Sequence, residues 1–230
     1  MNDFLYVKNN YMTLRESIER TADRVGVKPP MLLPVTKSGT DEELIALFSY
    51  GATALGENRP SELKRRAELL AEHGFSPELH EIGTLQSNKA KLISKNVSLV
   101  HSLASLSLAK ELNRQAAIHG RTIPVLIEIN SAEEMQKDGV MPSDARAFLE
   151  EILGFEGLDV RGLMTMGPVC EVKEDIRKYF RLTKELFDAL NSEYGFGGDP
   201  VLSMGMTDSY EIAIEEGSTL LRIGRRLFEK

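Results

Sequence analysis

One lysine stands where the chain could carry out amine chemistry. Lys37 directly follows the apolar run Met31 to Thr36. If that run is a buried strand, partial desolvation at its carboxyl end would lower the pKa of the amine and free it to attack an aldehyde. A lysine after a strand is more often a solvated loop residue, so this interpretation depends on the other strand ends.

Two glycine-containing segments near the C-terminus predict a phosphate site. Gly205, Met206 and Thr207 offer an open backbone and a hydroxyl just before a predicted helix, and Gly224 and Arg225 follow the last apolar run. Amides at such positions bind anions, although each segment alone is more often an ordinary turn. Both segments together with the lysine predict a ligand that has an aldehyde and an anionic tail.

Arg222 lies inside the last apolar run, where a residue that only filled the core would be apolar. A buried guanidinium needs a partner. One interpretation places it near a ring nitrogen of the ligand, which it would leave unprotonated because arginine does not give up its proton. The other pairs it with a carboxylate such as Glu211 or Glu215, and both stay open.

Two further kinds of polar residue lie at or near strand ends. Asn58 either caps the helix that begins near Pro60 or lines a ligand pocket. His80 and His101 are expected to be hydrogen-bonded core histidines, and neither is assigned as a base. The strand ends carry few paired carboxylates, which disfavours glycosidase chemistry. With one cysteine and four scattered histidines, we expect no metal site and assign no catalytic residue.

Short apolar runs alternate with longer amphipathic segments after a helix predicted over Asp3 to Val25, as in parallel strands joined by crossover helices. The predicted strands are Met31 to Thr36, Ala52 to Gly56, Leu79 to Gly83, Leu99 to Ser102, Ile123 to Asn130, Val160 to Thr165, Val201 to Ser203 and Leu220 to Ile223. The predicted helices include Glu42 to Tyr50, Pro60 to His73, Leu106 to His119, Ser143 to Leu153, Glu174 to Tyr194 and Tyr210 to Glu216.

Eight such β/α units predict the α/β class and one (β/α)₈ TIM-type barrel with an extra N-terminal helix, as a single domain over residues 1–230. An open doubly wound sheet would also alternate strand and helix. It normally carries a glycine-rich phosphate loop after its first strand, and Thr36-Lys37-Ser38-Gly39 is not that loop.

Composition limits the partners. The 28 Lys and Arg residues against 35 Asp and Glu give a net charge of −7, which disfavours nucleic acid. The sequence shows neither a signal peptide nor a membrane span, so we expect a cytoplasmic protein that does not bind a membrane.

Several motifs together resemble those of the pyridoxal-phosphate homeostasis proteins, stand-alone barrels similar to the N-terminal domain of alanine racemase. They occur in family order from about Met31 to the end of the chain. The matching stretches are residues 34–37, 48–59, 80–89, 162–166, 202–207, 211–217 and 221–224.

The resemblance implies a fold type III site for pyridoxal 5'-phosphate (PLP). Lys37 would hold PLP as a Schiff base, and Asn58 would line the pocket. Arg222 would approach the pyridine nitrogen. The loops with Met206 and Thr207, and with Gly224 and Arg225, would bind the phosphate.

Three positions depart from the family pattern, which has His at Thr84, Ser at Thr207 and Thr at Arg225. Thr207 keeps the hydroxyl. At Arg225 the phosphate would depend on the backbone amide, with the guanidinium either adding charge or turning to solvent.

The resemblance implies a monomeric PLP carrier, not an enzyme, that takes part in vitamin B6 and amino-acid homeostasis and exchanges the cofactor with apo PLP-dependent enzymes. A PLP-dependent amino-acid racemase is the first alternative. A racemase of this type takes a second base from a further domain, and this chain ends at Lys230, just after the eighth strand. The second alternative is a barrel enzyme that acts on phosphosugars without PLP.

Overall fold

Eight parallel strands form the centre of the computed structural model, which describes residues 4–168 and 170–230. All eight predicted strands match the observed ones to within two residues at either end, and the last two agree at both ends. The strands are β1 (Met31–Pro34), β2 (Ala54–Glu57), β3 (Glu78–Glu81), β4 (Leu99–Leu103), β5 (Ile123–Glu128), β6 (Leu158–Met164), β7 (Val201–Ser203) and β8 (Leu220–Ile223).

The strands close into a barrel. Their order is β1-β8-β7-β6-β5-β4-β3-β2, which differs from that of an open doubly wound sheet. Only a short contact joins the two ends of this series: Val35 bridges Gly56, and the Thr36 N–H donates to the Gly56 carbonyl at 3.1 Å. The TIM-type barrel is thus confirmed, with its narrowest connection beside Lys37.

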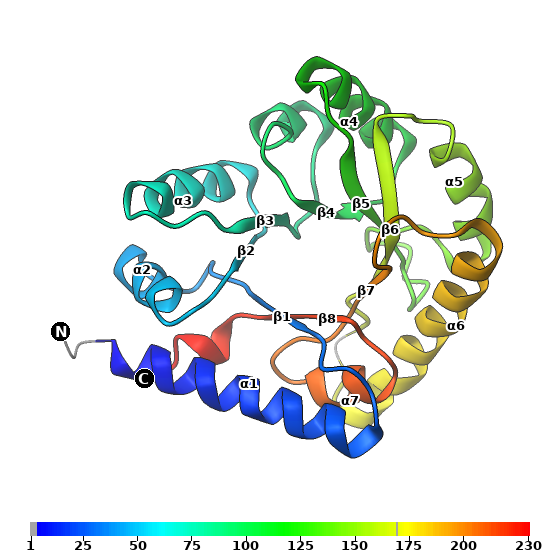
Figure 1. The fold of residues 1–230 in the computed structure, drawn as a ribbon. Helices are drawn as coiled ribbons and strands as arrows, with labels where there is room; N and C mark the ends of the chain where they lie inside the picture. Colours follow the sequence, from blue (N-terminus) through cyan, green and yellow to red (C-terminus); the bar gives the residue numbers. More distant parts are fainter. Residues whose placement is uncertain (1–3, 169) are drawn as a thin grey trace.

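Helices surround the barrel (Figure 1). The predicted helices are all present, and the proposed start of the first one at Asp3 lies outside the described residues. The α-helices are α1 (Leu5–Val25), α2 (Asp41–Ser49), α3 (Pro60–Glu72), α4 (Leu106–His119), α5 (Ala145–Ile152), α6 (Arg177–Tyr194) and α7 (Tyr210–Glu215). Short 3₁₀ turns are η1 (Ser87–Leu92), η2 (Pro142–Asp144), η3 (Lys173–Ile176) and η4 (Arg225–Leu227).

Local sequence explains where several helices begin and end. Thr40 and Glu43 form a capping box at the start of α2, and the Ser105 hydroxyl accepts from the Leu108 N–H at the start of α4. Gly26 and Gly120 end α1 and α4 in the left-handed conformation, which glycine adopts without strain.

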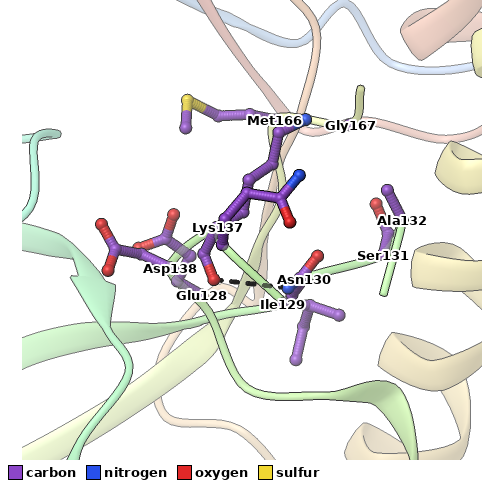
Figure 2. A pocket seen from close by; sticks show the side chains of 10 residues that line it. Glu128, Ile129, Asn130, Ser131, Ala132, Lys137, Asp138, Met166 and Gly167 are labelled. Carbon is purple, nitrogen blue, oxygen red and sulfur yellow. Dashed lines mark hydrogen bonds between the residues drawn. The ribbon is translucent and has the colours of Figure 1, made fainter. Parts of the chain in front are cut away.

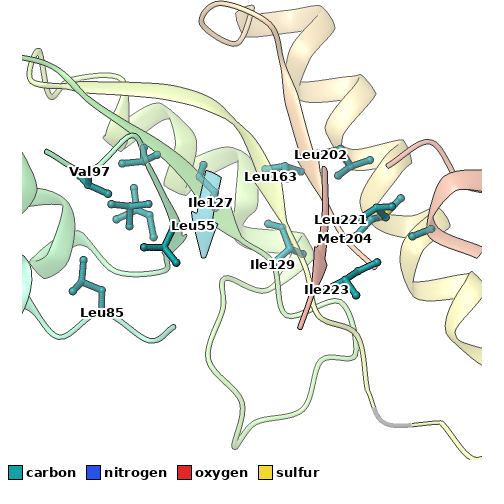
Figure 3. Packing of buried hydrophobic residues seen from close by; sticks show 14 of the residues in the cluster. Leu55, Leu85, Val97, Ile127, Ile129, Leu163, Leu202, Met204, Leu221 and Ile223 are labelled. Carbon is teal, nitrogen blue, oxygen red and sulfur yellow. The ribbon is translucent and has the colours of Figure 1, made fainter. Parts of the chain in front are cut away.

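The core has two layers because each strand is buried on both faces. The larger layer lies between the strands and the helices and includes Leu55, Ile127, Leu163, Leu202 and Leu221 (Figure 3). Two smaller apolar clusters are made by other strand residues. One contains Leu33, Ala54 and Leu220, and the other contains Leu99, Leu126 and Met164.

Helix α1 lies along β1 and β8, and Figure 1 shows the C-terminal segment beside it. Its Ser17 hydroxyl hydrogen-bonds with the Tyr210 hydroxyl of α7 at 2.9 Å, and Asn10 donates to the Glu229 carbonyl at 2.8 Å. The extra N-terminal helix therefore supports the segments that follow β7 and β8. None of the described helices has the length and apolar character that a membrane crossing requires.

Candidate functional site

The predicted site residues come together on one part of the barrel rim. Lys37 follows β1, Asn58 follows β2, and Thr207 follows β7. Arg222 lies in β8, the strand between β1 and β7. Because the carboxyl ends of parallel strands meet at one end of a barrel, four adjacent strand ends bring these groups together.

The backbone around Lys37 is held firmly while its side chain is exposed. Thr36 is fully buried, its hydroxyl donates to Glu57 Oε1 at 2.5 Å, and the Gly39 N–H closes a turn by donating to the Thr36 carbonyl at 2.9 Å. Among the residues described, none forms a hydrogen bond or ion pair with the Lys37 amine. The sequence suggested a partly desolvated amine, but Lys37 is exposed to solvent.

Arg66 of α3 holds the turn that carries Lys37. Its guanidinium donates to the Thr36 carbonyl at 2.5 Å and to the Gly39 carbonyl at 2.9 Å, and it pairs with Glu57 at 3.2 Å. Within the charged run Lys64-Arg65-Arg66 of α3, Arg66 is only 6% exposed because it turns from the helix toward the barrel.

Asn58 does not cap α3. The N-cap residue is Arg59, Pro60 occupies the first turn, and no side chain among the described residues accepts a capping hydrogen bond there. Asn58 is exposed at the rim, and its backbone packs so closely on Gly83 that any side chain at Gly83 would overlap it. The structure thus contradicts the cap interpretation and leaves the Asn58 amide free for a ligand.

The loop after β7 is shaped by a glycine. Gly205 has φ of +97°, and a Cβ there would lie 2.5 Å from the Ala213 side chain, so only glycine fits under α7. The Met206 N–H donates to the Ser209 hydroxyl at 3.1 Å, which leaves that amide already occupied. Within the described chain, the Thr207 N–H has no such partner, and its half-buried hydroxyl lies beside it.

The loop after β8 packs tightly against β1. A Cβ at Gly224 would lie 2.6 Å from the Val35 carbonyl oxygen, so glycine is needed for this contact. The Arg225 guanidinium pairs with Asp208 at 3.1 Å, and both side chains are more than 60% exposed. Arg225 therefore neither points freely into solvent nor contributes an unpaired charge, since it links the loops after β7 and β8.

Arg222 is buried, and its partners are uncharged. Its guanidinium donates to the Ser203 carbonyl at 2.9 Å, to the Ser203 hydroxyl at 2.6 Å and to the Thr165 carbonyl at 3.0 Å. Pairing with Glu211 or Glu215 does not occur, and Glu215 instead pairs with Arg24 and Arg177. Burial lowers the pKa of Arg222 to about 10, an effect that the charge of Glu128 opposes, so the guanidinium keeps its proton at neutral pH.

A cavity of about 250 Å³ opens at the ends of β5 and β6, and none of the predicted site residues is among those that line it (Figure 2). Glu128, Asn130, Ser131, Asp138 and Met166 are among the residues that line it. Burial raises the pKa of Glu128 to about 7, the negative charge of Asp138 raises it further, and Arg222 acts in the opposite direction.

Three strands end in a buried carboxyl group. Glu57, Glu81 and Glu128 end β2, β3 and β5, and none is more than 5% exposed. Burial is the main cause that raises the pKa of Glu81 to about 8; Glu57 adds to it, and the Gly83 N–H opposes it. The sequence predicted few paired carboxylates at the strand ends, and these three glutamates end three different strands.

His80 and His101 are buried and hydrogen-bonded to each other at 2.9 Å, as expected for core histidines. Among the methionines at or after the ends of β6 and β7, Met164 and Met204 are buried while Met166 and Met206 are exposed. The Thr84 hydroxyl, one of the three departures from the family pattern, donates to Asp138 at 2.7 Å and so connects the segment after β3 with that after β5.

Sequence reasoning missed the residues that support the site from behind. Thr36, Glu57 and Arg66 hold the Lys37 turn, while Thr165 and Ser203 hold Arg222. One signal was available: polar residues at the ends of otherwise apolar strands must have partners once they are buried. The identity of each partner depends on which strands face one another across the barrel.

The sequence is similar to a known domain family and to curated proteins that share one name. The model of the alanine racemase N-terminal domain matches residues 10–229. A pyridoxal phosphate homeostasis protein from Aquifex aeolicus is 39% identical over 215 residues, which cover 93% of each chain. One from Escherichia coli is 31% identical over 234 residues, which cover 99% of this chain and 97% of that one.

Solved structures show the same barrel. PipY from Synechococcus elongatus with PLP bound has a TM-score of 0.84 and 25% identity, and the match covers 97% of this chain and 100% of that one. An alanine racemase from Clostridium difficile has a TM-score of 0.74 and 17% identity, covering 92% of this chain and 58% of that one. The likeness to the racemase concerns the fold alone.

Proposed function

Because the chain belongs to the family of pyridoxal phosphate homeostasis proteins, we propose that it binds PLP reversibly as a Schiff base on Lys37. The observation that carries the proposal is the arrangement of adjacent strand ends. An exposed amine follows β1, two loops suited to an anion follow β7 and β8, and the buried Arg222 lies between them. PLP has the aldehyde and the phosphate that these groups would bind.

Each site residue has a role in this proposal. The Thr207 amide and hydroxyl and the Gly224 backbone bind the phosphate, and Met206 shapes the loop. Arg225 keeps the two phosphate loops together through Asp208. Asn58 lines the pocket, and Arg222 faces the pyridine nitrogen. The similar PipY structure was solved with PLP bound, which supports the choice of cofactor.

The protein acts as a carrier in cytoplasmic vitamin B6 and amino-acid homeostasis, as a monomer that passes PLP to apo PLP-dependent enzymes. Arg222 favours this role over racemisation. Because the pKa of Arg222 is about 10, the guanidinium stays charged; it would donate to the pyridine nitrogen of bound PLP and leave that nitrogen unprotonated. PLP held in this way would supply a weaker electron sink, which disfavours proton abstraction from an amino acid.

Borohydride reduction tests the Schiff base. In the presence of PLP, wild-type protein should show an aldimine absorbance band, and reduction should add the pyridoxyl mass to the peptide that contains Lys37. A Lys37→Ala variant should remain folded by circular dichroism and lose both signals, because no other amine lies at that strand end. Lys89→Ala removes another exposed lysine near the rim and should keep both signals.

Two results contradict the proposal. If Lys37→Ala keeps the band and the added mass, another lysine holds the cofactor; if wild-type protein gains no mass at all, an enzyme that acts on phosphosugars without PLP becomes the better interpretation. Racemisation is tested with single enantiomers of alanine and serine. Turnover at ordinary enzyme rates, about 1 s⁻¹ or faster, would contradict the carrier role.

A further inference from the structure

A chain of buried polar side chains crosses the inside of the barrel and ends at Arg222. His80 Nδ1 lies 2.9 Å from His101 Nε2, and His101 Nδ1 lies 3.0 Å from the Ser203 hydroxyl, which accepts from Arg222 at 2.6 Å. None of the four residues is more than 4% exposed. Because β4 and β7 are not neighbours in the sheet, the contact between His101 and Ser203 spans the barrel.

The direction of every hydrogen bond in this chain follows from its two ends. Arginine only donates, so Ser203 accepts from Arg222 and has its own hydroxyl proton to give to His101 Nδ1. Neutral His101 then carries its proton on Nε2 and donates to His80 Nδ1. Burial, together with the nearby charge of Arg222, lowers the pKa of His101 well below its ordinary value and so favours the neutral ring.

The far end of the chain favours the same direction. His80 then carries its proton on Nε2, which is buried, has no hydrogen-bond partner among the described residues and lies 3.6 Å from the Glu78 carboxylate. For a singly protonated His80, the reverse arrangement would place an unprotonated nitrogen against that carboxylate, which electrostatic repulsion disfavours. All donors therefore point away from Arg222 and toward Glu78.

The same hydrogen bonds determine which N–H groups of Arg222 stay available to a ligand. Of the five N–H groups of a guanidinium, three donate to the Ser203 carbonyl, the Ser203 hydroxyl and the Thr165 carbonyl. The Nε proton and one Nη2 proton have no acceptor in the described part of the chain. These two donors are the ones that a ring nitrogen could use.

We propose that Ser203, His101 and His80 are positioning residues, whose one-directional hydrogen-bond chain fixes the Arg222 guanidinium with two donors directed to the ligand. The positioning role rests on the proposed PLP site, whereas the direction of the chain does not. The two parts can therefore be tested separately.

Nitrogen-detected NMR of histidine side chains tests the chain in protein without PLP. His101 should carry its proton on Nε2 and keep this form from about pH 5 to 8, and His80 should accept the hydrogen bond at Nδ1. A proton on Nδ1 of His101, or titration of His101 in that range, would overturn the proposal. Since no cofactor is present, this result stands whether or not the protein binds PLP.

Paired serine variants test the effect on the ligand. Ser203→Ala removes the hydroxyl on which Arg222 and His101 meet, and it should raise the Kd for PLP about tenfold and shift the absorbance band of the bound cofactor. Ser102→Ala removes another buried hydroxyl, one that has no partner among the described residues. In this variant the Kd for PLP should stay within about twofold of wild type, and the absorbance band should not shift.

The pair separates positioning from general stabilisation. If Ser203→Ala lowers the melting temperature but leaves Kd and the absorbance band unchanged, the residue is merely structural and the positioning role is overturned. If the variant does not fold, the histidine protonation pattern of the wild-type protein still decides the direction of the chain. If wild-type protein binds no PLP, the proposed function fails while that measurement keeps its meaning.

Discussion

Three strands end in a buried glutamate, and the three carboxyl groups differ because their neighbours differ. Glu57 has the Arg66 guanidinium at 3.2 Å. Glu128 has Arg222 and Asp138 acting on it in opposite directions. Glu81 has the Gly83 N–H at 3.2 Å, while its other carboxyl oxygen is buried without a partner among the described residues. Of the three, Glu81 is the one whose ionisation the fold opposes most clearly.

The raised pKa of Glu81 predicts that stability falls as pH rises. Its pKa is about 8 in the folded protein and 4.5 as the ordinary value, so the native state holds a proton that the unfolded state releases. This stability is present in acid and is lost as pH approaches the folded pKa. Between about pH 6 and 8, the free energy of unfolding should fall by about 1–2 kcal/mol more in wild type than in Glu81→Gln.

Urea denaturation at several pH values measures this difference. Glu72→Gln removes an exposed carboxylate of α3 by the same change and should leave the wild-type pH dependence intact. Glu128, whose pKa is raised to about 7, contributes a slope of the same sign that remains in Glu81→Gln. Equal slopes in wild type and Glu81→Gln would show that Glu81 is ionised in the folded protein.

At the scale of elements, helix α3 does more than cover the outside of the barrel. Arg66 extends from it to the turn after β1 and pairs there with Glu57 of β2, so one helix connects two strand ends. The neighbouring Arg65 pairs with Asp41 of α2 at the surface. The same helix therefore positions the Lys37 turn from its buried face and contacts α2 from its exposed face.

Arg66→Met should destabilise the protein and weaken PLP binding together. The change keeps much of the apolar stem but leaves the Glu57 carboxylate buried without its cation, which costs about 3–5 kcal/mol. It also frees the Thr36 and Gly39 carbonyls, so the turn that carries Lys37 becomes less ordered. Denaturant unfolding and PLP titration measure the two effects.

Arg65→Met is the matched control for this prediction. Its ion pairs with Asp41 and Glu62 are solvent-exposed, so its loss should cost no more than about 1 kcal/mol and leave PLP affinity unchanged. If Arg66→Met binds PLP as tightly as Arg65→Met does, the hydrogen bonds from Arg66 to the Lys37 turn do not contribute to PLP binding.

At the scale of the whole molecule, the sequence was sufficient for the order and type of elements but not for their contacts across the barrel. The apolar runs predicted every strand because each is buried on both faces and thus continuous in hydrophobicity. The role of Arg66 was not predicted, because a charge run within a helix does not show which of its members turns inward. The contact of His101 with Ser203 joins residues 102 positions apart and depends on barrel closure, which local patterns do not specify.

Barrel closure depends on glycine where β8 meets β1. Gly224, the residue after β8, packs against Val35. The Val35 N–H donates to the carbonyl of Ile223, the last residue of β8, at 2.8 Å. On the other side of β1, the bridge from Val35 to Gly56 completes the ring. The same few residues therefore close the barrel, precede the Lys37 turn and begin the second phosphate loop, so strain introduced there should affect fold and ligand together.

Gly224→Ala tests this coupling. Its Cβ would lie 2.6 Å from the Val35 carbonyl oxygen, so β8 must move away from β1, at a cost of about 1–3 kcal/mol in the free energy of unfolding. Because the displaced backbone also belongs to the phosphate loop, PLP affinity should fall at least about tenfold. Gly154→Ala, where the nearest atom is the Glu151 carbonyl oxygen at 3.3 Å, should change both by little. Loss of stability with PLP affinity retained would separate closure of the barrel from binding of the cofactor, and the proposed phosphate loop after β8 would then have to be abandoned.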